Sequence, residues 1–434
     1  LRMKSIERKK LILFGAGKIG RSFIAQLFSR GGYEVVFIDI SRPLIEELNR
    51  RKSYRIVIKG EEEQVLTIEN VRGVCLYDEN EVVNEVASSG IIATSVGLGG
   101  LKGTFPLLAK GLLKRFNEGS HQPLDIIIAE NMRNADMYFR EQLMNLLPPD
   151  YPFDSLVGLV ETSIGKMVPI MNKKDIEEDM LQIFAEPYNT LILNRKGFRN
   201  EVPDIKGLAP KDNMKAWVDR KLFIHNLGHS ASAYIGHMYN PEFIFLWEAL
   251  AVPEIHGFVR SAMLQSAQIL MAEYPGEFTT AGLTEHIDDL LYRFQNKSLG
   301  DTIFRVGCDL KRKLGSEDRL AGAINKAFER GLSYNLIIFA LVCGCYFRAS
   351  DEEKKMLPDD IDFINRFGND VGHVMSEICG FDRKTRVKIF DEAFAVDKMI
   401  RSAGIIEAIR ITSGKNLTYE KNKALRVDND DYSI

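Results

Sequence analysis

A strand that leads through glycines into a helix constrains this chain more than any other part of its sequence. Residues 10–17 read KLILFGAG, and KIGRSFIAQLFSRGG at residues 18–32 has helical periodicity and closes on glycines. A second apolar run, YEVVFIDI, follows at residues 33–40. Continuous apolar runs of this length are typical of strands buried on both faces, as in a parallel sheet covered by helices. The segment therefore predicts a parallel β–α–β unit.

Other parts of the first half repeat this pattern. The further strand-length apolar runs are GIIATSVG (residues 90–97), LDIIIAEN (124–131), LVGLVETSIG (156–165) and NTLILN (189–194). YRIVIKG at residues 54–60 and EQVLTIENV at 63–71 indicate a hairpin inserted after a helix. We expect an α/β N-terminal domain, doubly wound and Rossmann-like, over residues 1–205.

The second half has a different character. Residues 195–213 are rich in Pro, Gly, Lys and Asp, which indicates a linker, and the windows 243–274 and 321–347 beyond it have helical periodicity. We expect a mostly α-helical C-terminal domain over residues 206–434. The tail RVDNDDYSI at residues 426–434 is expected to fray.

The loop GAGKIG has the spacing of a dinucleotide-binding turn. Gly15 permits a tight turn, Gly17 lets the backbone approach a pyrophosphate, and Gly20 lets helix and strand pack closely. The residues between and beside them that would face the cofactor are Ala16, Lys18 and Ile19. Asp39 ends the next strand, where it could accept a hydrogen bond from a ribose hydroxyl. The alternative is a plain glycine-rich turn, with Asp39 starting a loop.

The acidic residue after the second strand bears on the choice of cofactor. The Asp39 carboxylate would repel the extra phosphate of NADP and so favours NAD, although Arg42 lies close by in the sequence. Thr94, Val96 and Gly97 form a turn at another strand end. Strand ends of this kind face the ligand crevice, so the turn could contact the nicotinamide half, or it could be a tight turn and nothing more.

An apolar helical stretch, KLFIHNLGHS at residues 221–230, carries polar groups that a packed core would not hold. At about 100° per residue, Lys221, His225, Asn226 and His229 fall on one half of the helix. In one interpretation Lys221 snorkels to water and His229 is a hydrogen-bonded core residue. In the other, an amine, an amide and an imidazole converge on one volume.

A dinucleotide site in the same chain gives these groups a chemical use. Alcohol oxidation needs a general base and hydrogen-bond donors for a developing alkoxide. A lysine desolvated beside other cation-forming groups can act as a base near neutral pH. Asn226 and His229 could hydrogen-bond the oxygen as its charge changes.

The motif RKLFIHNLGHSASAYIG at residues 220–236 resembles the lysine-dependent polyol dehydrogenases, the long-chain mannitol dehydrogenase family. LFGAGKIGR resembles the cofactor loop of that family, and AENM at residues 129–132 resembles its strand-end asparagine motif. The resemblance implies that Lys221 is the general base, that Asn226 and Asn131 bind the reacting oxygen, and that His229 positions it. It also implies hydride transfer to a nicotinamide cofactor in a cleft between the domains, with no metal.

One motif departs from the family pattern. Where the family usually has an acidic residue followed by arginine, SIGKMVP places Gly165 and Lys166. Glu161 and Asp219 could compensate for the missing carboxylate. A zinc site is not expected either, because His225 and His229 are four apart but no third ligand is evident.

A group of cations bears on the class of substrate. RFQNKSLGDTIFRVG at residues 293–307 and RKLGSEDRL at 312–320 resemble the mannitol-1-phosphate 5-dehydrogenase branch, although Cys308 stands where that branch often has arginine. The candidate ligands of a substrate phosphate are Arg305, Arg312, Lys313 and Arg319. The alternative is a solvated charged loop, because acidic residues interleave with them.

Composition excludes several other functions. A net charge of -3 argues against a general nucleic-acid binder, and five scattered cysteines argue against a disulfide framework. The charged N-terminal segment and a longest apolar run of 12 residues indicate neither a signal peptide nor a membrane span, so a cytoplasmic protein is expected. We expect a monomer, because no heptad seam stands out.

The expected activity is NAD-dependent interconversion of mannitol 1-phosphate and fructose 6-phosphate. An unphosphorylated polyol or a hexuronate such as fructuronate or tagaturonate is the alternative substrate. An alternative of another class is a dinucleotide-binding sensor without turnover, to which the Gly165 departure is the one hint.

Overall fold

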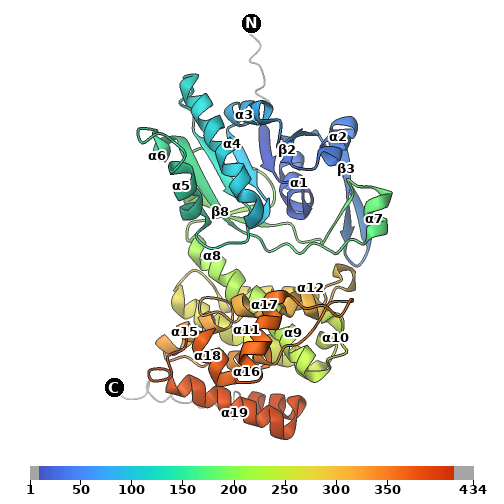
Figure 1. Ribbon diagram of the computed structural model, residues 1–434, viewed down its shortest axis with the longest axis vertical. Helices are drawn as coiled ribbons and strands as arrows, with labels where there is room; N and C mark the ends of the chain where they lie inside the picture. Colours follow the sequence, from blue (N-terminus) through green and yellow to red (C-terminus); the bar gives the residue numbers. More distant parts are fainter. Residues whose placement is uncertain (1–8, 415–434) are drawn as a thin grey trace. The chain divides into compact units, whose positions relative to one another are not determined.

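The computed structural model (Figure 1) describes residues 9–414. Within them eight strands form one sheet in the order β11-β10-β8-β7-β6-β1-β2-β5. The strands are β1 (Lys10–Phe14), β2 (Glu34–Asp39), β5 (Val71–Cys75), β6 (Ile91–Thr94), β7 (Leu124–Ile128), β8 (Val157–Ser163), β10 (Leu191–Asn194) and β11 (Leu208–Lys211). Neighbouring strands pair in parallel along the order β5, β2, β1, β6, β7 and β8. Beyond them, β10 pairs antiparallel with β8.

Both faces of this sheet are covered by helices. Alternate residues of β1 enter two different cores: Leu11 and Leu13 pack with Phe23 on one face, and Ile12 and Phe14 pack with Phe105 on the other. The helices of this unit are α1 (Ala25–Arg30), α2 (Arg42–Arg51), α3 (Glu79–Ala87), α4 (Gly97–Asn117), α5 (Ala135–Met144), α6 (Phe153–Leu156) and α7 (Lys173–Glu178). The predicted doubly wound, Rossmann-like domain is therefore confirmed.

The predicted hairpin is present and has a third strand. β3 (Ser53–Lys59) and β4 (Glu63–Glu69) pair antiparallel, and β9 (Ile183–Ala185) adds to β3 in parallel. The segment interpreted as a linker is partly structured, because β11 within it pairs with β10 along the sheet edge. The chain divides into two compact units between Val218 and Asp219.

The second unit is helical in its described part (Figure 1). Its helices include α9 (Leu227–Tyr239), α10 (Leu246–Leu250), α11 (Pro253–Glu273), α12 (Thr280–Phe294), α13 (Ile303–Gly307), α14 (Leu310–Lys313), α15 (Ala321–Glu329), α16 (Asn335–Cys345), α17 (Pro358–Phe367), α18 (Val371–Glu377) and α19 (Val387–Ala403). α8 (Met214–Arg220) precedes them and crosses the division between the units. The predicted mostly helical domain is confirmed.

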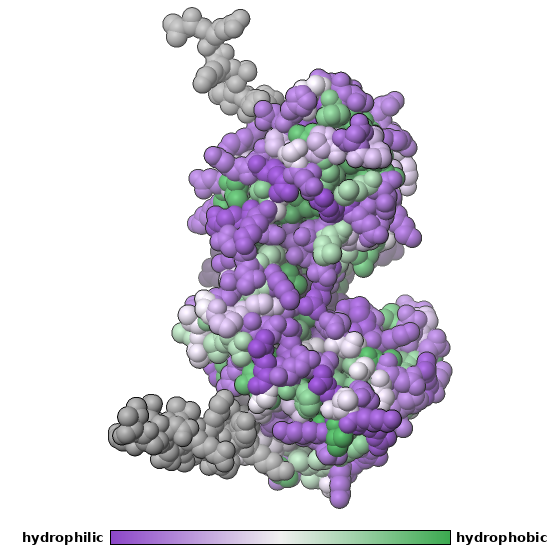
Figure 2. Space-filling model, turned by 90° about the vertical axis from the view of Figure 1, so that its left-hand side faces the viewer, coloured by the Kyte–Doolittle hydropathy of each residue, from purple (hydrophilic) through white to green (hydrophobic). Residues whose placement is uncertain are grey.

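The longest apolar run of the sequence is the centre of this helical unit. Residues 336–345 of α16 are all buried, and α9, α11 and α19 pack against them. Among the described residues no helix combines the length and the apolar character that crossing a bilayer requires. Figure 2 shows hydrophilic side chains over most of the face in view, with apolar residues scattered among them. The fraying predicted for residues 426–434 lies outside the described residues.

Candidate active site

The three glycines of the cofactor loop meet different surroundings in the first unit. Gly15 has a φ of 97°, and a Cβ there would lie 2.4 Å from the Ser95 carbonyl oxygen. At Gly20 a Cβ would lie 2.1 Å from the carbonyl oxygen of Gly15. At Gly17 it would meet nothing within 4 Å. Two glycines are thus required by packing, and the third leaves open space where a ligand can approach the backbone.

Asp39 and Arg21 hold this loop in place. One oxygen of the Asp39 carboxylate accepts from the Ala16 amide at 2.8 Å, and the other accepts from the Ser41 amide at 2.9 Å. The buried Arg21 guanidinium donates to the Ala16 carbonyl at 2.7 Å and to the Leu181 carbonyl at 2.6 Å. A carboxylate offers about four acceptor positions, so Asp39 retains capacity for a further donor. Sequence reasoning missed Arg21, whose signal is a charged residue inside an otherwise apolar helix.

The remaining loop residues differ in exposure. Lys18 is exposed, Ile19 is partly buried and Ala16 is buried. The loop leads into a π-helical turn, η1 (Gly20–Ile24), before α1. Arg42 forms an ion pair with Asp78 at 3.0 Å, so the cation that weakened the NAD argument has its own acidic partner.

The turn after β6 is held by a buried glutamate. Glu130 accepts from the Val96 amide and the Gly97 amide, each at 2.9 Å, and Thr94 before them is fully buried. Burial raises the pKa of Glu130, against the effect of these backbone hydrogen bonds. The carboxylate satisfies amides at the start of α4 that would otherwise lack intrahelical acceptors. Sequence reasoning passed over Glu130, although it stands in the quoted AENM motif.

Asn131 directly follows this glutamate. It lies on the loop after β7 and is exposed. It therefore belongs to the first unit, at the carboxyl end of a central parallel strand, where ligands of such sheets bind.

The second unit contains the other three predicted catalytic residues. Lys221, Asn226 and His229 are partly exposed, whereas residues 222–225 are buried. Residues 221–226 form a π-helical turn, η3 (Lys221–Asn226), and not the α-helix that the angular argument assumed. Positions five apart are about 140° apart on an α-helix, but the i→i+5 bonding of a π turn brings them toward one side. The turn therefore gathers Lys221 and Asn226 and leaves His225 in the interior.

Lys221 has the electrostatics of a base. Burial of its ammonium group, with Arg319 and Arg312 nearby, lowers the pKa of Lys221 to about 8. Asp318 acts in the opposite direction with a smaller effect. An amine with this pKa is present in both protonation states near neutral pH, as a proton acceptor in a reversible reaction requires.

His229 is held between a carboxylate and an aromatic ring. Its Nε2 lies 3.0 Å from a carboxylate oxygen of Asp301, and its ring stacks on Phe294 with centroids 4.6 Å apart. Burial, with Arg305, Lys313 and other cations around the ring, lowers the pKa of His229 well below its usual value. The imidazole is therefore neutral.

The four predicted phosphate ligands lie around these groups but differ in availability. Arg305 pairs with Asp301 and Arg312 pairs with Asp309, and their side chains are 49% and 53% exposed. Lys313 is buried and donates to the Val306 carbonyl at 2.8 Å.

Arg319 is also buried and donates to the Ser230 hydroxyl at 3.1 Å. It further donates to the Asn226 carbonyl at 3.5 Å. Arg319 therefore supports the turn that carries Asn226, whereas the side chains of Arg305 and Arg312 are about half exposed.

The residues at the departure from the family pattern have structural surroundings. Lys166 is buried and donates to the Asn189 side-chain oxygen at 3.0 Å. Glu161 accepts from the Ala135 amide at 3.2 Å. Asp219 is fully buried and accepts from the Tyr274 hydroxyl at 2.5 Å. A Cβ at Gly165 would lie 3.4 Å from the Tyr188 hydroxyl oxygen, which is ordinary van der Waals contact, so a side chain is sterically allowed there.

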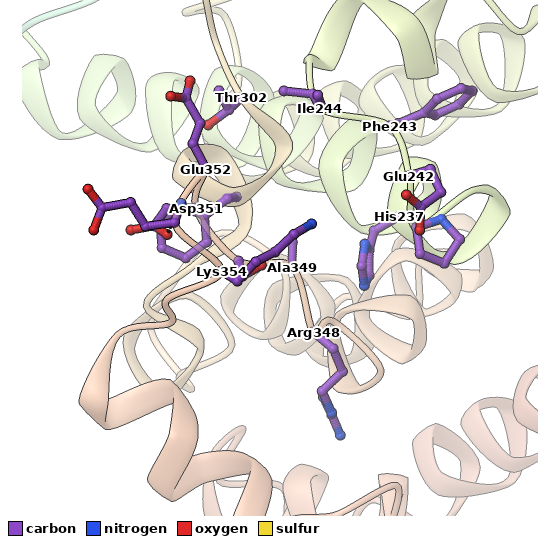
Figure 3. Close-up of a pocket in the computed structure, with 14 residues that line it drawn as sticks. His237, Glu242, Phe243, Ile244, Thr302, Arg348, Ala349, Asp351, Glu352 and Lys354 are labelled. Carbon is purple, nitrogen blue, oxygen red and sulfur yellow. Dashed lines mark hydrogen bonds between the residues drawn. The ribbon is translucent and has the colours of Figure 1, made fainter.

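The helical unit has a cavity of about 650 Å³ whose lining includes none of the predicted catalytic residues (Figure 3). Its lining includes His237, Ile244, Thr302, Arg348 and Lys354. Within residues 9–414 no group of three or more His, Cys, Asp or Glu is arranged to hold a metal ion.

Two family models match the chain. Residues 9–207 match the model of the mannitol dehydrogenase Rossmann domain, and residues 213–370 match that of the mannitol dehydrogenase C-terminal domain. A D-sorbitol dehydrogenase solved in substrate-free form is 15% identical, with a TM-score of 0.78 over 93% of this chain and 95% of its own.

Mannitol 2-dehydrogenase of Pseudomonas fluorescens, solved with NAD and D-mannitol, is 16% identical, with a TM-score of 0.73 over 94% of this chain and 95% of its own. These two structures share the fold of this protein. Mannitol dehydrogenases are NAD-dependent oxidoreductases that act on CH–OH groups. Because the two family models together match well over half of its residues, the chain belongs to the mannitol dehydrogenase family.

Proposed function

We propose that the protein interconverts mannitol 1-phosphate and fructose 6-phosphate with NAD, using Lys221 as the general base. The observation that carries the proposal is the π-helical turn that brings Lys221 and Asn226 toward one side, with Arg319 and Arg312 close enough to act, after burial, in lowering the pKa of Lys221 to about 8. A desolvated amine beside cations suits both proton transfer and an anionic substrate.

The first unit fits a dinucleotide. The open space at Gly17 admits a pyrophosphate, and Asp39 keeps acceptor capacity for a ribose hydroxyl. The Thr94–Gly97 turn and Asn131 stand at strand ends of the same sheet. Bound NAD supplies the hydride acceptor for alcohol oxidation.

The residues of the second unit account for the proton. In oxidation, the neutral amine of Lys221 accepts the hydroxyl proton while the carbon of the same group loses hydride, and a carbonyl forms. Asn226 and Asn131 donate hydrogen bonds to the oxygen as negative charge develops on it. In reduction, the protonated Lys221 returns the proton. In these roles the amine of Lys221 gains or loses one proton, and no covalent bond forms between the protein and the substrate.

The positive charge near Lys221 favours a phosphorylated substrate. Arg312 and Arg319 both act on the pKa of Lys221, and Arg305 and Lys313 act on that of His229. A phosphate would be drawn to this excess, and a bidentate arginine would orient it.

A second candidate is an unphosphorylated ketose or a hexuronate. It is favoured by the acidic partners of the two exposed arginines, Asp301 for Arg305 and Asp309 for Arg312. Those partners reduce the charge left for a phosphate. The carboxylate of a hexuronate carries less negative charge than a phosphate and would need less positive charge from the protein.

The test is NADH oxidation with fructose 6-phosphate, fructose and fructuronate in parallel. The proposal expects turnover with fructose 6-phosphate at a kcat/KM at least about 100-fold above that with fructose. Equal or better turnover of an unphosphorylated substrate would overturn the phosphate assignment and leave the lysine mechanism standing. Arg312→Gln should raise the KM for fructose 6-phosphate, and the exposed Arg366→Gln serves as its matched control.

Lys221 is tested separately. Lys221→Ala should lower turnover by at least about 1,000-fold while NADH still binds. Retained turnover in this variant would contradict the proposed base.

A further inference from the structure

We propose that Asp301 is a positioning residue that fixes His229 as a hydrogen-bond acceptor, so that His229 binds a substrate hydroxyl and does not stabilise the alkoxide. The inference rests on the proposed polyol dehydrogenase function. It assigns to His229 the recognition of a substrate hydroxyl that does not react, and to Asp301 the choice of the tautomer of His229.

Asp301 is built to hold a fixed position. It is 5% exposed and lies between η4 (Lys297–Leu299) and α13. Its carbonyl accepts from the Leu246 amide at 2.9 Å, and the Ile303 amide donates to the Ile244 carbonyl at 2.8 Å. The backbone at Asp301 and directly after it is therefore tied to residues 244–246 at the start of α10.

Each oxygen of the Asp301 carboxylate has its own partner. One oxygen pairs with the Arg305 guanidinium, and the other lies 3.0 Å from His229 Nε2. A carboxylate paired with arginine is ionised and can only accept hydrogen bonds. The hydrogen in the contact with His229 must therefore be on Nε2.

The second ring nitrogen follows from the charge of the ring. The charged groups around His229 from neighbouring elements are Asp301, Arg293, Arg305, Lys313 and Arg319, together with the His225 ring at 6.0 Å. Cations outnumber the one carboxylate, and burial also disfavours the charged ring. A neutral imidazole with its proton on Nε2 has a bare lone pair on Nδ1.

The ring is also fixed in direction. It stacks on Phe294 with an interplanar angle of 18°. Within residues 9–414 the ring hydrogen-bonds no group besides Asp301. Nδ1 is thus an acceptor without a protein donor, on a residue that is partly exposed.

This acceptor decides what His229 can bind. A developing alkoxide needs donors, and Nδ1 offers none. A neutral hydroxyl can donate to Nδ1 both before and after hydride transfer, because it belongs to a carbon that does not react. His229 therefore recognises a substrate with a hydroxyl beside the reacting carbon, a polyol and not a simple alcohol.

The first experiment reads the tautomer directly. Long-range ¹H–¹⁵N spectra of the ¹⁵N-histidine-labelled full chain should show His229 with hydrogen on Nε2 and no protonation between about pH 6 and 9. The signal is assigned by its loss in His229→Gln. A proton on Nδ1, or an imidazolium in this range, would overturn the proposal. This result does not depend on which substrate the enzyme turns over.

The second experiment uses Asp301→Asn with two substrates, the polyol and an analogue that lacks the hydroxyl next to the reacting carbon. The variant should raise the KM for the polyol about 10-fold with a smaller change in kcat, and the KM for the deoxy analogue should stay the same. Asp288→Asn is the matched control. Asp288 also pairs with an arginine, Arg260, at 2.7 Å, but it is not among the groups that act on His229.

An equal loss with both substrates would overturn the proposal. If Asp301→Asn does not fold, His229→Gln must show the same selective rise in KM. Failure of the proposed lysine mechanism would be seen separately, as retained turnover in Lys221→Ala. That outcome would not change the tautomer of His229 that the spectra report.

Discussion

The Asp39 carboxylate accepts a hydrogen bond from the Ala16 amide at 2.8 Å, which joins the end of β2 to the glycine loop after β1. The residue expected to choose the cofactor thus also shapes the glycine loop that is expected to bind the cofactor. A substitution at Asp39 should therefore change both cofactor preference and loop stability.

Asp39→Ser should raise the NADP to NAD ratio of kcat/KM by at least about 10-fold, because it removes the carboxylate that repels the extra phosphate. Adding Asp78→Ser should raise the ratio further, since Asp78 holds Arg42 in an ion pair. Steady-state kinetics with both cofactors measure it. An unchanged ratio in the double variant would contradict this role of Asp39.

The glycine loop offers a test that separates cofactor binding from folding. Gly17→Val should leave the melting temperature nearly unchanged and weaken NADH binding by about 10-fold or more, because the side chain fills open space at the loop. Gly20→Val should instead lower the melting temperature, since its Cβ would lie 2.1 Å from the Gly15 carbonyl oxygen. Thermal melts and NADH fluorescence titrations distinguish the two. Similar melting temperatures for both variants would contradict the packing argument.

Alcohol oxidation should depend on pH through Lys221. Its amine accepts a proton only when neutral, so kcat/KM should rise with pH through about 8 and then level off, as the pKa of Lys221 implies. Carbonyl reduction should show the opposite trend. Arg312→Gln removes a nearby positive charge, so the midpoint should move to higher pH. A midpoint that stays fixed or falls would contradict the electrostatic assignment.

Glu130 should be needed for the turn after β6. Glu130→Ala leaves the Val96 and Gly97 amides without their acceptor and should cost about 1–3 kcal/mol of unfolding free energy. NADH affinity should fall as well, if the turn contacts the cofactor. Denaturant unfolding and NADH titration measure the two effects, with the exposed Glu118→Ala as control. Equal stability of the two variants would show that Glu130 does not hold the turn.

Much of the fold was predictable because local pattern and tertiary environment agree. Buried parallel strands such as β1, β6 and β7 are apolar on both faces, so their sequences read as continuous runs. β11 escaped prediction because LAPK has little strand character and becomes a strand only through its pairing with β10. Edge strands of this kind depend on a neighbour that local sequence does not reveal.

The candidate site was predictable where a motif is contiguous. Lys221, Asn226 and His229 lie within nine residues, so their grouping could be inferred, but the partner of His229 is Asp301, distant in sequence. Arg319 resembled a phosphate ligand in the sequence, and its burial against Ser230 became visible only in the folded chain. Long-range partners of this type carry no local signal.

The π-helical turn at residues 221–226 also fixes the length of this segment. Removing one residue within it would restore ordinary α-helical bonding and leave the helix beyond in nearly the same orientation, because five residues of a π turn and four of an α turn both sweep a little more than one full turn. Lys221 and Asn226 would then be four apart, about 40° from each other, and would still share one side of the helix. The residue lost would come from the buried stretch 222–225, so a single-codon deletion here should damage the packing behind the amine and the amide more than their grouping.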